Sequence, residues 1–128
     1  MQNKSVLITG ASSGIGYAFA EIFAKNSYNL ILVARREKEL LDLKKKCEQS
    51  QVIVKIIVKD LAQPNASQEL YDQLKKEKIQ TDILINNAGF GEYGSFYNTS
   101  WEKEAVMIQL NIVELTHLAK LFGQEMVQ

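Results

Sequence analysis

The chain of 128 residues has one cysteine, one proline and no formal net charge at pH 7, and these features exclude several classes of protein. The single cysteine, Cys47, excludes an internal disulfide and any metal site built from several thiolates. Its spacing from Leu40 and Leu43 places it on the apolar stripe of a helix, which predicts a buried structural thiol rather than a nucleophile. Basic and acidic residues number 15 each, so the charge balance gives no basis for binding nucleic acid or an anionic membrane.

The beginning of the chain also lacks a long apolar run. After residues 1–4, the apolar residues 6–8 are followed at once by Thr9 and Gly10. A signal peptide or a membrane span needs a far longer run. We therefore expect a soluble, cytoplasmic chain with one core, and neither a membrane nor a nucleic acid as its partner.

Short apolar runs alternate with longer amphipathic stretches along the chain. Strands are predicted at residues 5–9, 29–34, 52–58 and 81–86, and helices at residues 14–26, 36–49, about 65–78 and 99–128. Asn65 or Ser67 is expected to cap the third helix, and Thr99 with Glu102 forms a capping box before the last one. This alternation requires crossover connections, which give a parallel sheet with helices on both faces. The fold class is therefore α/β, a Rossmann-type doubly wound parallel sheet that stops after the fourth strand and its following helix.

The last predicted helix is apolar on more than one side. Its main stripe has apolar residues three and four positions apart: Trp101, Ala105, Ile108, Ile112, Leu115, Ala119, Phe122 and Met126. Further apolar residues widen this stripe: Leu110, Val113, Leu118 and Leu121. One side can pack on the sheet, and we expect the other to form a homo-oligomer through the 99–128 helix.

A glycine-rich loop joins the first strand to the first helix, with the sequence Thr9-Gly10-Ala11-Ser12-Ser13-Gly14-Ile15-Gly16. Glycine permits a tight turn and a close backbone approach. The start of a helix offers free N–H groups and the positive end of its dipole to a phosphate. This placement predicts a dinucleotide-binding site, with an ordinary glycine-rich connection as the alternative.

The end of the second predicted strand indicates which dinucleotide binds. A carboxylate about 20 residues beyond the loop would bond the ribose hydroxyls and favour NAD. Ala34, Arg35 and Arg36 stand there instead. A guanidinium can bind a 2′-phosphate with paired hydrogen bonds, so NADP (NADPH) is the predicted cofactor. Alternatively, both arginines form the solvated start of a charged helix.

Polar residues also follow the third and fourth predicted strands. Asp60 closes the third strand, where its carboxylate could read an adenine amino group, and Asn86-Asn87-Ala88-Gly89 closes the fourth. In an open α/β sheet, ligands bind beyond the carboxyl ends of the strands, where all of these residues fall. Structural bonding within the sheet is an alternative role for Asn86, because buried amides need partners.

Together these motifs resemble the short-chain dehydrogenase/reductase family. The resemblance covers the whole chain and rests on Thr9-Gly10-x-x-x-Gly14-Ile15-Gly16, Asp60-Leu61, Asn86-Asn87-Ala88-Gly89 and Asn111 in the following helix. It implies that Ser12, Ser13, Gly14 and Ile15 lie along the cofactor phosphates, that Arg35 binds the 2′-phosphate, that Asp60 and Leu61 border the adenine, and that Asn87, Ala88 and Gly89 border the adenosine ribose and sheet core. Gly10 and Gly16 of the loop and Arg36 after the second strand complete the predicted cofactor site. The resemblance also implies that Asn111 is the catalytic asparagine, which positions a water in a proton relay.

The resemblance further implies catalytic residues that this chain does not contain. Family members continue with a strand that bears a serine, and then with a tyrosine and a lysine four residues later. Tyr71 and Lys75 have that spacing but precede the fourth predicted strand, and His117 is expected to be a packing or interface residue. We therefore expect residues 1–128 to be a single, incomplete NAD(P)-binding Rossmann domain, from a truncated, frameshifted or split protein.

The expected function is that of an NADP-dependent oxidoreductase for carbonyl reduction and alcohol oxidation, here as a cofactor-binding half that is inactive alone. Its small-molecule carbonyl or alcohol substrate would belong to the full-length relative. The alternative is a non-catalytic dinucleotide-binding or oligomerising fragment. A methyltransferase is less favoured, because Ala34 and Arg35 supply no acid for the ribose hydroxyls. A sheet cut after four strands would have a bare edge, which predicts poor stability, aggregation or dependence on a partner.

Overall fold

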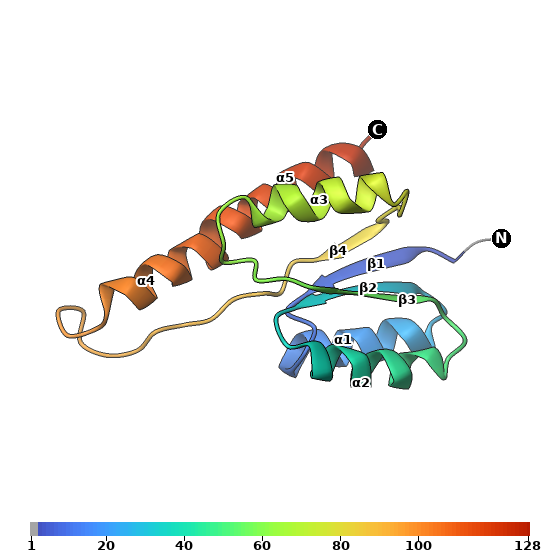
Figure 1. Ribbon diagram of the computed structural model, residues 1–128, viewed down its shortest axis with the longest axis horizontal. Coiled ribbons are helices and arrows are strands. Elements are labelled where there is room, and N and C mark those ends of the chain that lie inside the picture. Colours follow the sequence, from blue (N-terminus) through green and yellow to red (C-terminus); the bar gives the residue numbers. More distant parts are fainter. Residues whose placement is uncertain (1–2) are drawn as a thin grey trace.

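The computed structural model describes residues 3–128. Met1 and Gln2, which belong to the predicted domain, lie outside the described residues. The elements in chain order are β1 (Ser5–Thr9), α1 (Gly14–Lys25), β2 (Asn29–Ala34), α2 (Glu37–Glu48), β3 (Val54–Val58), α3 (Ala66–Lys76), β4 (Ile83–Ile85), α4 (Trp101–Ile108), the π-helical η1 (Gln109–Glu114) and α5 (Leu115–Met126). The four strands form one parallel sheet in the order β3-β2-β1-β4. Helices α1 and α2 cover one face and α3 and α5 the other, which confirms the predicted doubly wound α/β fold (Figure 1).

Alternate residues of each strand enter two separate apolar layers. On β1, Val6 and Ile8 pack toward α1 and α2, whereas Leu7 packs toward α3 and α5. Because both faces of a parallel sheet are covered, its strands read as continuous apolar runs. Cys47 lies in the first layer with only 2% of its surface exposed, as the sequence predicts. Burial raises the pKa of its thiol to about 11, so the unreactive thiol form dominates at neutral pH.

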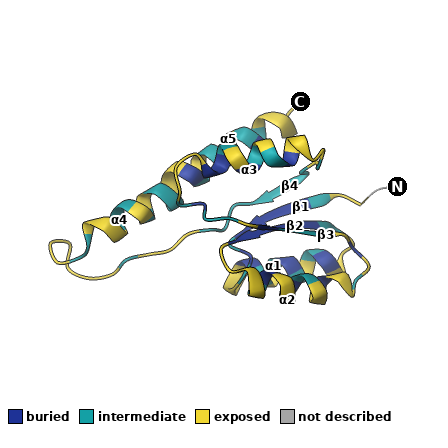
Figure 2. Cartoon of the chain, viewed as in Figure 1, coloured by how far each residue is buried: buried dark blue, intermediate teal, exposed yellow. Residues whose placement is uncertain are grey.

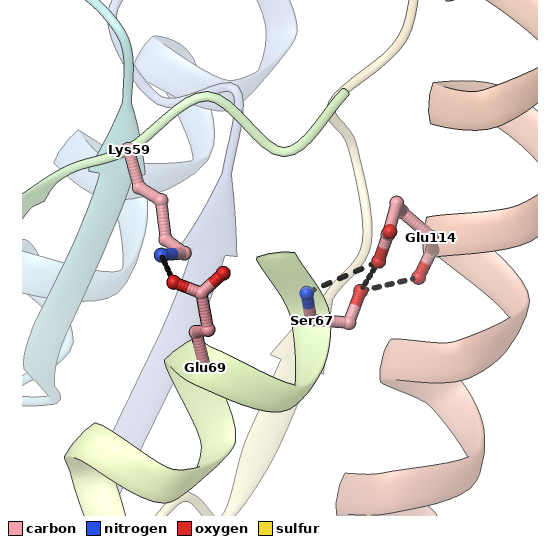
Figure 3. A network of polar contacts seen from close by, with 4 residues as sticks. All are labelled: Lys59, Ser67, Glu69 and Glu114. Atoms are coloured by element: carbon pink, nitrogen blue, oxygen red, sulfur yellow. Dashed lines mark hydrogen bonds and ion pairs between the residues drawn. The ribbon is translucent and has the colours of Figure 1, made fainter. Parts of the chain in front are cut away.

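Two predicted helix caps are wrong. Ser100, not Thr99, precedes α4, and its hydroxyl accepts a hydrogen bond from the Lys103 amide at 3.4 Å. Asn65 precedes α3 but makes no side-chain capping bond. Ser67 lies inside α3, where its amide donates to the Glu114 carboxylate at 3.0 Å (Figure 3). The carboxylate that caps α3 therefore comes from η1, 47 residues away, and local sequence cannot reveal such a partner.

The predicted helix 99–128 is a single helical run, Trp101–Met126, whose middle is π-helical. Only its second half carries apolar residues that are buried, namely Leu118 and Phe122, which pack beside α3. Trp101 is 65% exposed and Ile112 is 59% exposed, so this part of the stripe does not pack on the sheet. The physical reason is that α4 extends beyond the carboxyl ends of the strands, where no layer of the described chain covers it (Figure 2).

By length and composition, this same run is the one helix within residues 3–128 that is long and apolar enough to cross a membrane. Its most apolar stretch of 18 residues has a mean hydropathy of 1.3, and 17% of that stretch is buried. A helix from the core of a globular domain meets the same criterion, so one such helix is weak evidence for a span.

Strand β4 forms one edge of the sheet, because among the described strands it pairs with β1 alone. All three of its residues are half-buried. The bare pairing edge expected from the sequence is therefore present in the described part of the chain.

Candidate nucleotide-binding site

A cavity of about 330 Å³ lies beyond the carboxyl ends of the strands. Of the cofactor-binding residues predicted from sequence, all except Gly14 and Gly16 line this cavity. It is also lined by residues that the sequence prediction missed: Val33, Ala34, Lys59, Phe90 and Leu110. A second hollow of about 570 Å³ lies near the start of β4, and no predicted site residue lines it.

The glycine loop is shaped by close backbone contacts at two of its glycines. A Cβ on Gly16 would lie 2.4 Å from the Gly10 carbonyl oxygen, and one on Gly10 would lie 3.0 Å from the Ala88 Cα. Gly10 also has a φ of +64°, which favours glycine. Gly14 has a φ of +58° but nothing within 4 Å of its added Cβ, so it borders open space.

The first turn of α1 fits a phosphate group. Ser13 precedes the helix in an extended conformation, makes no side-chain capping bond, and the first turn has no acidic residue. The first N–H groups of a helix have no partner inside the helix, and the helix dipole favours an anion there. The open space beside Gly14 gives such an anion access, so the donor groups of this loop suit a pyrophosphate.

Asn87 fastens the end of β4 to the glycine loop. Its side-chain nitrogen donates to the carbonyl oxygens of Thr9 and Gly10, at 3.2 and 3.3 Å. The Thr9 hydroxyl accepts from the amides of Asn87 and Ala88, each at 2.9 Å. These four bonds join β1 to the β4 end and fix the floor of the cavity.

Two arginines stand at the end of β2, where no carboxylate is present. Arg35 is exposed and lines the cavity. Arg36 reaches the glycine loop, where its Nη2 atom donates to the Ser12 hydroxyl at 3.2 Å. Lys59 lines the same cavity, so the lining includes three cationic residues and one acidic residue, Asp60. This charge balance attracts a phosphate.

Asp60 and Leu61 form the turn that follows β3. The Asp60 carboxylate accepts from the Ala62 amide at 2.9 Å and from the Gln63 side chain at 3.1 Å. Leu61 is 5% exposed and packs in the layer of α3, although it also lines the cavity. Both side chains therefore order this turn.

Asn111 lies in η1 and holds the loop that follows β4. Its side-chain nitrogen donates to the Phe90 carbonyl at 2.7 Å, and its oxygen accepts from the Phe90 amide at 3.1 Å. A Cβ on Gly89 would lie 2.8 Å from that oxygen, so glycine is required at this approach. Asn111 does not line the cavity itself.

Asn86 connects β4 to the helical run. Its side-chain nitrogen donates to the Leu115 carbonyl at 2.7 Å, directly after the π-helical segment. The sequence left open a structural bond of Asn86 within the sheet. Its side-chain nitrogen does make a structural bond, but the partner is the helical run and not the sheet. The π-helical geometry disrupts the regular carbonyl pattern of the helix, and this amide satisfies one of the carbonyls.

Tyr71 and Lys75 lie on α3, away from the cavity. Tyr71 packs edge-on against Phe122, with 5.3 Å between ring centroids. Lys75 pairs with Glu125, and this hydrogen bond raises the pKa of Lys75. Within residues 3–128, no tyrosine or histidine lines the cavity, and no group of three metal-ligating side chains occurs.

Comparison with known proteins relates this geometry to a family. Residues 4–128 match the family model described as short chain dehydrogenase. The chain is 33% identical to the oxidoreductase UcpA of Salmonella typhimurium, over 100% of this chain and 48% of that protein. It is 28% identical to a 7beta-hydroxysteroid dehydrogenase of Mediterraneibacter gnavus, over 93% of this chain and 46% of that protein.

Solved structures give the same relationship. A short-chain dehydrogenase from Sphingobium yanoikuyae, in complex with NADPH, is 38% identical with a TM-score of 0.89, covering 98% of this chain and 49% of that one. A bulky-bulky ketone specific alcohol dehydrogenase from Comamonas testosteroni is 33% identical with a TM-score of 0.88, covering 98% of this chain and 50% of that one. The chain thus spans about half the length of the relatives it matches. It belongs to the short-chain dehydrogenase family of oxidoreductases.

Proposed function

We propose that residues 1–128 are the nucleotide-binding half of an NADP-dependent oxidoreductase that interconverts carbonyl and alcohol groups. The observation that supports NADP most directly is the cavity itself, which joins the glycine loop to Arg35 and Arg36 and has no acid at the end of β2. The NADPH complex of the Sphingobium yanoikuyae relative supports the same cofactor class. Two of the relatives are a 7beta-hydroxysteroid dehydrogenase and a bulky-bulky ketone specific alcohol dehydrogenase, which supports a small-molecule carbonyl or alcohol substrate.

In this proposal, each part of the cavity has one task. The amides of the glycine loop, at Ser12, Ser13, Gly14 and Ile15, bind the phosphates, with Gly10 and Gly16 shaping the loop. Arg35 and Arg36 bind the 2′-phosphate with charge-assisted hydrogen bonds. The turn at Asp60 and Leu61 borders the adenine, and the segment Asn87, Ala88 and Gly89 borders the adenosine ribose. The bound nicotinamide would supply or accept the hydride.

Proton transfer needs groups beyond those that line this cavity. Asn111 holds the Phe90 backbone. We therefore propose that its role is to position the loop after β4 on the side of the site where the substrate would bind. With no tyrosine at the cavity of the described chain, we propose that residues 1–128 alone bind cofactor without turnover. The same observation favours the second candidate function, a non-catalytic dinucleotide-binding fragment.

Replacing Arg35 by glutamate is expected to weaken NADPH binding about 30-fold and to leave NADH binding within about twofold. A charge-assisted hydrogen bond is worth about 1.5–3 kcal/mol, and only NADPH carries the 2′-phosphate that makes it. Titration by fluorescence of the bound reduced nicotinamide measures both affinities. Lys38→Glu makes the same charge change at an exposed position outside the cavity and should change neither. An equal loss for both nucleotides, or tighter NADH binding by the unchanged chain, would contradict the NADP proposal.

We further propose that a second copy of the chain covers the exposed apolar side of α4 and η1. Trp101, Ile108 and Ile112 recur there seven and four positions apart, and each is at least 40% exposed. Exposed apolar surface of this kind is typical of an interface.

The double variant Trp101→Glu, Ile112→Glu is therefore expected to be a monomer where the unchanged chain is a dimer or larger, because buried carboxylates oppose association. Sedimentation velocity measures the difference. Val127→Glu is the control, since Val127 is 87% exposed but lies beyond α5. A monomeric unchanged chain would contradict the proposed interface.

A further inference from the structure

Lys59 is a cation of the cavity lining that the glycine-loop and arginine motifs do not account for. It follows β3 directly, and only 20% of its side chain is exposed, a low fraction for a lysine. Its Nζ atom lies 3.3 Å from the Glu69 carboxylate of α3 (Figure 3). The residue lines the cavity, while its ammonium is paired with Glu69, which does not line it.

The sheet register places Lys59 beside Arg35. The Lys59 amide donates to the Ala34 carbonyl at 2.9 Å, which extends the β2–β3 ladder one residue past the pair of Ala34 and Val58. Ile57 and Val33, each two residues earlier, both pack in the layer of α3 and α5. Because alternate residues of a strand share a face, Lys59 and Arg35 continue this same face beyond the strand ends.

The nearby carboxylates are not equally placed to neutralise this pair of cations. The Asp60 carboxylate is occupied by the Ala62 amide and the Gln63 side chain. Glu69 contacts Lys59 and is itself 60% exposed, so solvent screens this ion pair. A 2′-phosphate carries more negative charge than a carboxylate and would compete well for the lysine.

We propose that Lys59 is a second determinant of NADPH selectivity. Its ammonium adds to the positive charge that Arg35 presents to the 2′-phosphate. Glu69, the present partner of this ammonium, competes with the phosphate for it. This inference rests on the proposed NADP function and extends it to Lys59 and Glu69, which belong to none of the family motifs.

The chain offers a matched control for the test. Lys55, at the other end of β3, pairs with Glu77, the residue that follows α3, at 3.0 Å and does not line the cavity. Lys59→Met and Lys55→Met both keep the alkyl stem, remove one charge and break one ion pair between β3 and α3. Lys59→Arg keeps the charge, and Glu69→Gln removes the competing carboxylate.

Binding of NADPH and of NADH to the 128-residue chain is measured for each variant, with thermal unfolding to show that each one folds. We expect Lys59→Met to weaken NADPH binding about 5- to 10-fold with NADH unchanged, since the lost attraction acts across a partly screened site. Lys59→Arg and Lys55→Met should keep the NADPH preference. Glu69→Gln should strengthen NADPH binding about two- to threefold.

Equal losses for both nucleotides in Lys59→Met, or the same loss in Lys55→Met, would overturn the inference. If Lys59→Met does not fold, Glu69→Gln decides, and an unchanged or weaker NADPH affinity overturns the inference. If Arg35→Glu removes the NADPH preference and Lys59→Met does not, this inference fails while the proposed function stands. If the unchanged chain binds neither nucleotide, both fail.

Discussion

Replacing Gly16 by alanine is expected to destabilise the chain by about 3 kcal/mol, the upper range for overpacking a tightly packed site. The added Cβ would lie 2.4 Å from the Gly10 carbonyl oxygen and 2.6 Å from the Asn87 side-chain nitrogen. The carbonyl is backbone and cannot turn away as a flexible side chain can. The glycine loop must therefore move away from α1, and the Asn87 bonds that hold it would weaken.

The same displacement is expected to weaken NADPH binding about 100-fold, because amides aimed at the phosphates lose their alignment. Urea denaturation measures the stability and nucleotide fluorescence the affinity. Gly123→Ala is the matched control, since Gly123 lies in α5 with nothing within 4 Å of an added Cβ. That change should stabilise the chain by about 0.5–1 kcal/mol. If Gly16→Ala behaves like Gly123→Ala, the close approach is not what requires glycine.

The contrast between these glycines shows how far a motif can be read from sequence. The loop was predictable because a strand, a glycine pattern and a helix follow one another locally. The sequence did not reveal that Gly16 is needed for space and Gly14 for its positive φ, since the first depends on the Gly10 carbonyl and the second on backbone conformation. The bounds of β1 and β2 were likewise predictable, because each apolar run ends at a change of residue type.

The unpredicted features depend on partners far away in the sequence. Asn111 bonds Phe90, 21 residues earlier, through a π-helical segment that no periodicity distinguishes from an ordinary helix. Lys59 was missed because a lysine at a strand end is usually solvated, and only the structure shows that it lines the cavity and pairs with Glu69. An apolar stripe predicts that a face needs cover but not what covers it, so the sequence did not reveal that Trp101 lies outside the layers on the sheet.

Among the features that depend on partners far away in the sequence, Glu114 has the largest expected effect on stability. It is 2% exposed, and its carboxylate accepts from the Ser67 amide and the Gln109 side chain, each at 3.0 Å, and also from the Ser67 hydroxyl (Figure 3). Ser67 is in the first turn of α3, where the helix dipole favours a negative group. This one side chain therefore caps α3 and ties it to the segment that carries Asn111.

Replacing Glu114 by alanine is expected to cost about 3–4 kcal/mol of unfolding free energy, measured by urea denaturation. The change leaves the buried Ser67 amide without an acceptor and opens a small cavity, while the Ser67 hydroxyl keeps its bond to the main-chain carbonyl of residue 114 at 3.0 Å. Glu114→Gln keeps one acceptor oxygen without the charge, so about half of that loss is expected. Glu102→Ala makes the same truncation at an exposed position of the same helical run and should cost far less.

The cycle of Glu114→Ala, Ser67→Ala and the double variant separates the capping contact from simple loss of packing. If the contact carries the effect, the double variant should lose less stability than the sum of the two single losses, because the bond between the Ser67 hydroxyl and the Glu114 carboxylate is removed by either change alone. Additive losses would instead assign the effect to the packing of each side chain. In that case Glu114 fills space between α3 and η1, and the helical run is held beside α3 mainly by the packing of Leu118 and Phe122.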